Sequence, residues 1–314
     1  MKNLRKKITA AAFIFTLLLV SAAPPASALA AQADTGVLNG ILAAYAQKNL
    51  PSDWETLVLA LNGKELPKDY LKNLEDTVKR KKGTFALTTD YARIVLIYRA
   101  SGRSPANIAG YDFAARLYNA KSLTKQGGNG AIWALIALSG DMRIPAGAKW
   151  QTTTLCQEVL KYQKSDGGFA LTAKSASETD LTAMAIVALS PYQADAVVSK
   201  ALESALSFLL AQQKKDGFAT NDAVTCESTA QAVMALCALG KSPADSAYQK
   251  NGKTLPQQLD AFRVSATAYE HTAKGGANTV ATQQAALALT ALARYEAAQG
   301  PVTVYVKTPT AKLK

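Results

Sequence analysis

Apolar and polar positions along this chain alternate in a way that predicts pairs of helices. From about residue 35 to residue 295, one member of each pair carries Lys, Glu and Gln along one face, and the next is an apolar run rich in small residues. A helix that is apolar nearly all round is buried on all sides, whereas an amphipathic helix covers a core with one face. The pattern therefore predicts six outer and six inner helices in alternation.

Helix-ending residues give these elements approximate bounds. Pro51 cannot continue a helix, and Gly240 can end one in the left-handed conformation. The predicted pairs are 35–48 with 54–61, 67–79 with 90–101, 108–118 with 130–139, 148–162 with 180–189, 195–213 with 228–239, and 255–264 with 282–295. Because strand signals are rare, we expect an all-α fold. Closure of the pairs on themselves would form an (α/α)6 toroid, and an open superhelix is the alternative.

A repeat with a period close to 50 residues accompanies these pairs. Residues 160–190 read LKYQKSDGGFALTAKSASETDLTAMAIVALS, and a similar stretch from residue 209 reads LLAQQKKDGFATNDAVTCESTAQAVMALCALG. Thr182 corresponds to Thr229 and, in a weaker third copy at 279–292, to Thr282. Self-similarity at this period is typical of an array of supersecondary units.

The first 30 residues have the pattern of a secretory signal peptide. A basic start is followed by the apolar run from Ile8 to Val20 and by a small-residue cleavage motif that ends at Ala30, with a second cut site at Ala33. The apolar run is short for a membrane span, although a retained anchor is the alternative, and no later segment has 18 consecutive apolar residues. We expect residues 1–30 to be a signal peptide, 31–300 a helical domain and 301–314 a C-terminal tail, in a secreted or cell-surface protein without a transmembrane segment.

Charge and cysteine content exclude some functions. Removal of residues 1–30, which hold four basic and no acidic residues, lowers the formal net charge from +12 to +8. The lysines are scattered, with the densest cluster at 79–82, whereas a nucleic-acid site needs a basic stripe with interleaved aromatic residues. We therefore expect no nucleic-acid partner. Three cysteines, an odd number, argue against a disulfide framework.

A polar or aromatic group stands at the start of each predicted inner helix. Helix N-termini carry unsatisfied N–H groups and a partial positive charge, so such groups can cap the helix, bind a ligand, or both. If the six starts surround one end of a central cavity, they form a mouth. The candidate ligand-binding residues are Trp54, Asp90, Tyr91, Asn129, Asp180, Glu227 and Gln283.

The repeats resemble those of a known superfamily. The Gln-x-x-Asp-Gly-(Gly)-Phe turns at 163–169 and 213–218, each paired with a Thr-Ala-rich inner helix, are similar to the repeat of the terpenoid cyclase and protein prenyltransferase superfamily. More closely, most of residues 40–300 resembles the exported bacterial prenyltransferase/squalene-cyclase-repeat proteins related to the transcobalamin and intrinsic factor α-domain. The matching stretches include 53–72, 89–99, 124–138 and 271–295. The resemblance implies an α/α toroid, in a superfamily that includes cyclases, lipid transferases and non-catalytic vitamin carriers.

The enzymatic members imply chemistry that this chain matches only in part. Class II terpene cyclases protonate an alkene with the central aspartate of an Asp-x-Asp-Asp motif; here Asp180 holds that position, but Leu181 replaces a carboxylate that would tune the acid's pKa. Few inner-helix aromatic residues are available to stabilise a cation: Trp54, Tyr91, Tyr98 and Trp133. Prenyltransferases hold zinc through Asp, Cys and His, and this chain has one histidine, His271, so no metal site is expected.

The carriers imply a binding role. In transcobalamin-like proteins the mouth of the toroid contacts a corrinoid through polar inner-helix starts, and Asp180 matches one such contact. These carriers close over the ligand with a C-terminal β-domain, whereas only a short tail that could begin one strand follows Gly300, so a separate chain could supply the lid. We expect an exported, non-catalytic protein that binds cobalamin or another bulky, partly apolar small molecule and has no cofactor. A terpenoid-cyclase-like enzyme with Asp180 as catalytic acid and a structural or adhesive cell-surface module are the alternatives.

Overall fold

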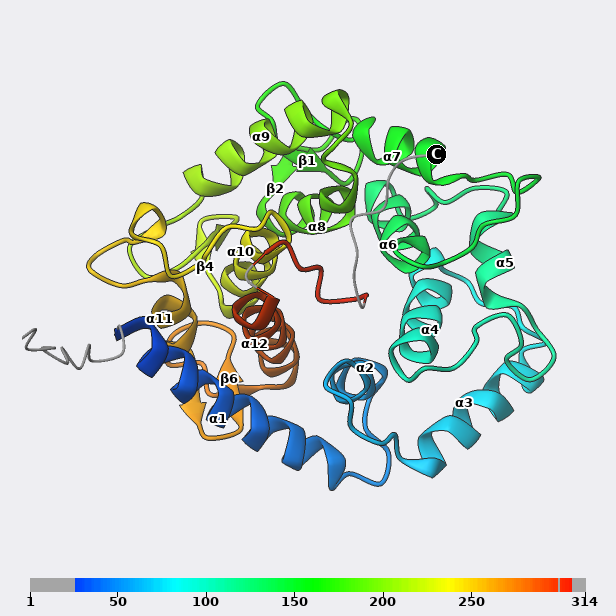
Figure 1. Cartoon of the computed structure of the whole chain (residues 1–314), viewed down its shortest axis with the longest axis horizontal. Helices are drawn as coiled ribbons and strands as arrows, with labels where there is room; N and C mark the ends of the chain where they lie inside the picture. Colours follow the sequence, from blue (N-terminus) through cyan, green and yellow to red (C-terminus); the bar gives the residue numbers. More distant parts are fainter. Residues whose placement is uncertain (1–25, 299, 307–314) are drawn as a thin grey trace, which may run out of the picture.

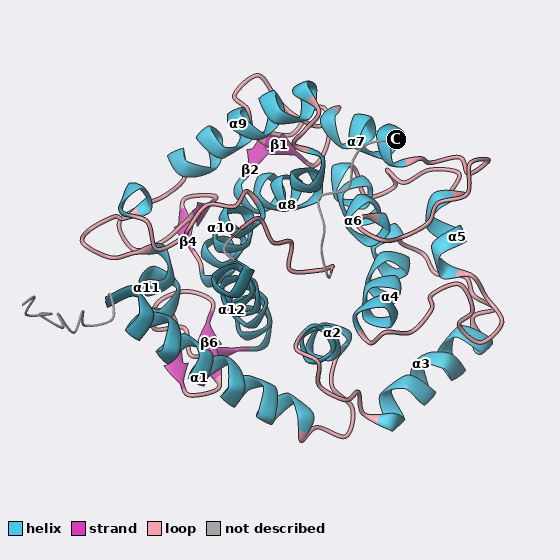
Figure 2. Cartoon of the chain, viewed as in Figure 1, coloured by secondary structure: helices cyan, strands magenta, loops and turns pink. Residues whose placement is uncertain are grey.

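The chain is mostly helical, as the pattern predicts, with short strands between the helices (Figure 2). The computed structural model describes residues 26–298 and 300–306. The expected signal peptide falls almost wholly in residues 1–25, outside the described residues, and so does the end of the expected tail, residues 307–314. Both stay predictions.

Six apolar helices lie nearest the centre of the molecule (Figure 1). They are α2 (Asp53–Leu61), α4 (Thr88–Ala100), α6 (Gly128–Leu138), α8 (Thr179–Leu189), α10 (Cys226–Ala238) and α12 (Thr279–Ala298). Each packs against the next in the series, and α12 also packs against α2. The small residues of these helices are almost entirely buried, because each helix has neighbours on several sides.

Six further helices lie outside this inner set (Figure 1). They are α1 (Ala26–Ala46), α3 (Lys68–Arg80), α5 (Phe113–Tyr118), α7 (Thr152–Leu160), α9 (Ala196–Ala211) and α11 (Leu255–Asp260). In α3 the buried residues Tyr70, Leu74 and Val78 follow one another at intervals of four, which is the single apolar stripe of an amphipathic helix. Two short 3-10 helices, η1 (Ser190–Tyr192) and η2 (Ser246–Tyr248), complete the helical elements of the described residues.

Three outer helices are clearly shorter than the sequence pattern predicts: α5, α11, and α7, which covers Thr152–Leu160 rather than residues 148–162. The carboxylate of Asp112 accepts the N–H of Ala115 and caps α5, so the helix begins at Phe113 rather than at residue 108. Helix α11 ends at Asp260 because the next residues leave it for strand β5 (Arg263–Ser265). The apolar pattern continues through the segments next to α5 and α11, which is why periodicity alone overestimates the length of these two helices.

Short antiparallel strands lead into three of the inner helices, and the all-α expectation missed them. The pairs are β1 (Phe169–Ala170) with β2 (Ser177–Glu178), β3 (Ala219–Thr220) with β4 (Ala223–Val224), and the three-stranded set of β5, β6 (Ala268–Glu270) and β7 (Ala277–Asn278). Strands of two or three residues are too short to produce a recognisable alternation of apolar and polar positions.

A threonine in the first turns of an inner helix joins each of these hairpins to its helix. Each hydroxyl accepts the backbone N–H of a buried aromatic residue and donates to the carbonyl four residues before it in the helix. The three sets are Thr182 with Phe169 and Glu178, Thr229 with Phe218 and Thr225, and Thr282 with Tyr269 and Asn278. A buried N–H without a partner is costly, so the repeated threonine has a structural role in every copy.

The first residues of the tail turn back among the inner helices (Figure 1). Val302 N–H donates to the Cys237 carbonyl at 3.0 Å, and Val304 and Tyr305 are buried. The Tyr305 ring packs edge-on against Trp133 of α6, with 5.3 Å between ring centroids. Over residues 301–306 the tail therefore forms a turn in the interior and not the strand that its alternating valines allowed.

Candidate functional site

Polar groups link the starts of the inner helices to one another. We call this set the polar rim: Asp53 with Arg93, Thr89 with Gln126, Asp180 with Thr220 and Ser228, Gln231 with Gln284, and Gln283 with Ser52. Between α6 and the hairpin that precedes α8, the link is a backbone bond from Gly128 N–H to the carbonyl of Leu171, which follows β1, at 2.8 Å. Each of these bonds joins residues near the starts of two inner helices, or of a helix and the hairpin before the next one, and the Gln283–Ser52 bond joins α12 to the residue before α2.

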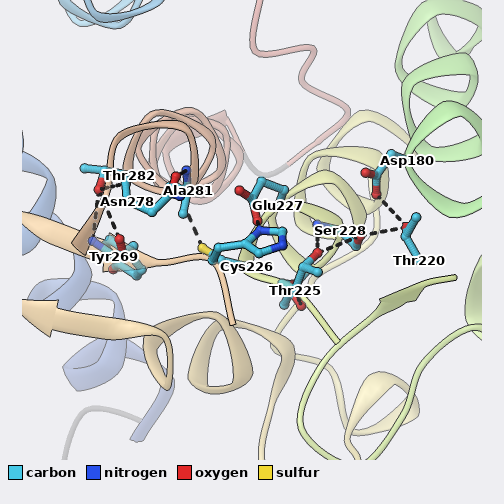
Figure 3. A network of polar contacts seen from close by, with 12 residues as sticks. Asp180, Thr220, Thr225, Cys226, Glu227, Ser228, Tyr269, Asn278, Ala281 and Thr282 are labelled. Carbon is cyan, nitrogen blue, oxygen red and sulfur yellow. Dashed lines mark hydrogen bonds and ion pairs between the residues drawn. The ribbon is translucent and has the colours of Figure 1, made fainter. Parts of the chain in front are cut away.

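Asp180 lies in a chain of hydroxyl groups between α8 and α10 (Figure 3). Its carboxylate accepts the Thr220 hydroxyl at 3.3 Å, and the hydroxyls of Thr220 and Ser228 are 2.9 Å apart. Burial raises the pKa of Asp180 above its ordinary value. Hydrogen bonds from Ser228 and Thr220 oppose that rise, the charge of Glu227 adds to it, and His271 opposes it. The carboxyl group therefore stays protonated to a higher pH than a solvated aspartate does.

Glu227 contacts a histidine, His271, that the sequence does not associate with it. One carboxylate oxygen lies 2.8 Å from His271 Nδ1, with the glutamate side chain 15% exposed and the histidine 53% exposed. Glu227 lies in α10 and His271 follows strand β6, and the His271 carbonyl also accepts the N–H of Cys226 at 2.9 Å. Sequence spacing gives no signal for this pair because the hairpin before α12 brings it together.

Trp54 belongs to an aromatic cluster in the interior. Its ring centroid lies 5.2 Å from that of Trp133, and Trp133 in turn contacts Tyr305. We call Trp54, Trp133 and Tyr305 the interior aromatic cluster. Because α2, α6 and the tail are separate in the series of helix contacts, these rings meet across the interior. The sequence identified the two tryptophans as inner-helix aromatics, but it gave no sign that a tail tyrosine joins them.

Of three further candidate residues, Gln283 belongs to the polar rim, whereas, among the described residues, Asp90 and Asn129 do not bond to a neighbouring inner helix. Gln283 is buried and donates to the Ser52 hydroxyl at 3.0 Å, whereas Asp90 caps its own helix and pairs with Arg93 at 3.2 Å. Asn129 is half-buried in the first turn of α6, and none of the described residues forms a hydrogen bond with its side chain.

Tyr91 does not join the other candidate residues. Its ring packs against Phe85 and Phe113, and its hydroxyl bonds with the backbone of Phe85. This contact places it between α4 and α5. The aromatic side chain therefore serves the packing of an outer helix onto an inner one.

Cavities border the inner helices, and one of them is lined by Thr88 and Tyr91 at the start of α4. Three of them, of about 490, 400 and 760 Å³, are lined by described residues, and none of these three is bordered by Asp180 or Glu227. Within the described ranges, no group of three or more His, Cys, Asp or Glu side chains is arranged to hold a metal ion. No helix in the same ranges combines the length and the apolar character that crossing a membrane requires.

Comparison with known proteins does not assign a family: no protein-family model matches the chain, and no curated protein matches it significantly.

Proposed function

We propose that the chain is an (α/α)6 toroid of the kind found in the exported prenyltransferase/squalene-cyclase-repeat proteins. Support comes from the series of inner-helix contacts, in which α12 packs on α2. Two side-chain bonds join the same helices: Gln283 to Ser52 at the start of α2, and Asn62 to Thr290, at 2.9 Å, at its end. An open superhelix would leave its first and last helices without each other as neighbours and would need polar caps in their place.

The function that these features support best is non-catalytic binding of a bulky, partly apolar small molecule by an exported protein. The observation that carries this proposal is the polar rim with an aromatic wall behind it. Small-molecule sites combine an apolar surface with a few convergent polar groups. Here Trp54 supplies aromatic surface, while Asn129, Asp180 and Glu227 supply an amide and two carboxyl groups from different helices. A corrinoid, which is large and has both apolar and amide-bearing edges, is the leading ligand class.

The tail favours entry of the ligand from the rim. Residues 301–306 pack against the later part of α10 and of α12, through Cys237 and Arg294, and reach Trp133 from that side. The interior aromatic cluster then lies between the tail and the rim. A ligand at the rim would meet Trp54 first, and a separate chain could cover it from outside.

A terpenoid-cyclase-like enzyme with Asp180 as general acid is the second candidate, and the raised pKa of Asp180 favours it. The aromatic surroundings favour it less. Tyr98 donates to Glu75 of the outer helix α3, and Tyr91 packs toward α5, so neither ring is available to a cation in the interior. Of the aromatic residues on the inner helices, Trp54 and Trp133 face each other there.

Retention of a coloured corrinoid tests the binding proposal. The purified chain is incubated with cobalamin or cobinamide, desalted, and examined for visible absorbance that elutes with the protein. We expect retention by the wild type and at least a tenfold loss of affinity when Asp180→Ala and Glu227→Ala are combined, since each lost polar contact at a buried site weakens binding by about tenfold or more. Glu203→Gln, an exposed change on α9, is the matched control and should leave retention unchanged.

The enzymatic alternative has its own test. Squalene and geranylgeranyl diphosphate are incubated with the wild type and with Asp180→Asn, and the products are separated by gas chromatography. Product formed by the wild type and absent with the variant would overturn the non-catalytic proposal. Neither retained corrinoid nor product would instead favour a structural or adhesive module.

A further inference from the structure

A second cluster of charged residues lies at the opposite ends of the inner helices from the polar rim. A cavity of about 490 Å³ adjoins the ends of α2, α4 and α6, and its described lining includes Arg99, Arg103, Arg143 and Arg294 with one carboxylate, Asp141. An adjoining cavity of about 400 Å³ also borders Arg103 and adds Lys64, Lys68 and Glu65. Positive side chains therefore outnumber negative ones in both.

Two of the arginines are already bound to the protein. Arg99 donates to the carbonyls of Ala137 and Ser139 at 2.7 and 2.8 Å, and to Asp141 at 2.5 Å. Arg294 donates to the carbonyl of Leu61 and, at 2.6 Å, to that of Val304. These carbonyls lie at or just beyond the ends of α6 and α2 and in the tail. The two guanidinium groups therefore offset the partial negative charge of the helix C-termini and hold the cavity wall in place.

The other two arginines have no such partners. Arg103 and Arg143 are exposed, and no described residue forms a hydrogen bond or an ion pair with either guanidinium group. Arg103 follows Gly102, whose φ of 72° turns the chain at the end of α4. Because Asp141 already binds Arg99, it does not neutralise this pair. The cavity thus presents two unpaired guanidinium groups beside Arg99 and Arg294, which already bind backbone carbonyl groups of the protein.

We propose that this cavity binds a small multivalent oxyanion, carried as phosphate or carboxylate groups, through Arg103 and Arg143. The planar guanidinium group matches the paired oxygens of either anion and binds them by two parallel hydrogen bonds. The cavity volume lies within the range of roughly 300 to 1,000 Å³ that small-molecule sites occupy. The site is distinct from the polar rim, so each proposal can fail without the other.

Calorimetric titration of the full chain with pyrophosphate and with citrate at about 0.1 M ionic strength, where the Debye length is about 10 Å, tests this site. We expect submillimolar binding of at least one anion, and the preferred anion shows whether phosphate or carboxylate is the better ligand. The double variant Arg103→Ala/Arg143→Ala should weaken binding by about tenfold or more, as loss of charged hydrogen bonds implies. The variant Arg103→Lys/Arg143→Lys keeps both positive charges but loses the planar guanidinium groups. Its affinity for the anion should lie between that of the wild type and that of Arg103→Ala/Arg143→Ala.

The control is Lys214→Ala/Lys215→Ala, which removes the same formal charge from exposed positions after α9. It should bind the anion within about twofold of the wild type, because screened charges far from a site contribute little. Equal weakening in the control and in the arginine-to-alanine variant would overturn the proposal, as would the absence of binding to either anion by the wild type. Melting curves should show all the variants folded, and the single variant Arg143→Ala replaces the double variant if that one does not fold.

Discussion

At the scale of single residues, the described side chains show two uses of a polar group at the start of a buried helix. Thr229 satisfies backbone groups, because its hydroxyl accepts the Phe218 N–H at 3.0 Å and donates to the Thr225 carbonyl at 2.8 Å. Asp180, in the first turn of the neighbouring inner helix α8, is instead a half-buried ionisable group whose carboxylate accepts hydrogen bonds from the hydroxyls of Thr220 and Ser228. The first arrangement serves the fold, and the second costs stability that a binding role would explain.

Removal of the Thr229 hydroxyl should therefore destabilise the protein. Thr229→Val keeps the shape of the side chain but leaves the buried Phe218 N–H without a partner, which should lower the free energy of unfolding by about 1–3 kcal/mol. Urea unfolding followed by circular dichroism measures this change. Thr229→Ser keeps the hydroxyl, so its free energy of unfolding should fall distinctly less. Equal decreases for the two variants would contradict the role of the hydroxyl as the partner of the Phe218 N–H.

Asp180 should make the stability depend on pH. Its pKa is raised in the folded protein, chiefly by burial, so the folded state binds the proton more tightly than the unfolded state does. Stability from this group is then fully present below the unfolded pKa and is lost as pH rises through the raised folded pKa. Asp180→Asn should raise Tm at pH 7 and have little effect at pH values below about 4, near the ordinary pKa of aspartate.

Thermal melts of the wild type and of Asp180→Asn between pH 3 and pH 8 provide the measurement. Glu203→Gln, on the exposed face of α9, should leave the pH profile of Tm unchanged. A lower Tm for Asp180→Asn at pH 7 would show that the ionised carboxylate is favourable, contrary to the effect of burial.

At the scale of elements, the ends of the described inner helices are held by side chains from elsewhere in the chain. The α12 residue Arg294 donates both to the Leu61 carbonyl at the end of α2 and to the Val304 carbonyl of the tail. One guanidinium group thus joins three segments. Burial removes this group from water and lowers the pKa of Arg294.

Replacement of Arg294 should loosen all three segments together. Arg294→Met keeps much of the side-chain volume but leaves two carbonyls unpaired, and the free energy of unfolding should fall by about 2–4 kcal/mol, since hydrogen bonds to charged groups contribute about 1.5–3 kcal/mol each and do not add fully. Guanidinium chloride unfolding measures the loss. Arg294→Lys keeps a positive charge but not the two-pronged guanidinium group, and its free energy of unfolding should fall by less. Arg116→Met, at an exposed position on α5, should leave the free energy of unfolding almost unchanged.

At the scale of the whole molecule, the described tail fills part of the space that the inner helices surround. Tyr305 covers one side of Trp133, while Trp54 contacts the same tryptophan from α2. The tail therefore decides how much of the interior a ligand can reach from the ends of α10 and α12. Because Tyr305 covers Trp133, the fluorescence of this tryptophan reports whether the tail is in place.

A chain that ends at residue 300 should expose Trp133. We expect its tryptophan emission to shift to longer wavelength and acrylamide to quench it more strongly, because water replaces the Tyr305 ring. The loss of buried Val304 and Tyr305 should also lower stability by about 2–5 kcal/mol, the usual range for removing large buried side chains. A chain that ends at residue 306 keeps these contacts and serves as the control; identical spectra for the two chains would argue against the packing of the tail on Trp133.

The apolar pattern was sufficient to locate the helices, because helical period and end signals are local properties of the chain. The inner helices were predicted to within a few residues, and Thr182, Thr229 and Thr282 were correctly matched as equivalent positions. Two- and three-residue strands and the true length of α5 were not predictable, because they depend on single hydrogen bonds rather than on periodicity.

The candidate site divides in the same way. That polar groups begin the inner helices could be predicted, and so could the presence of Trp54, since each is a matter of residue type at a helix start. The pairing of Glu227 with His271, the packing of Tyr91 away from the interior and the return of Tyr305 onto Trp133 were decided only by the tertiary structure. These contacts join residues from different repeats or from the tail, and their geometry depends on how successive helices pack, which no local pattern encodes.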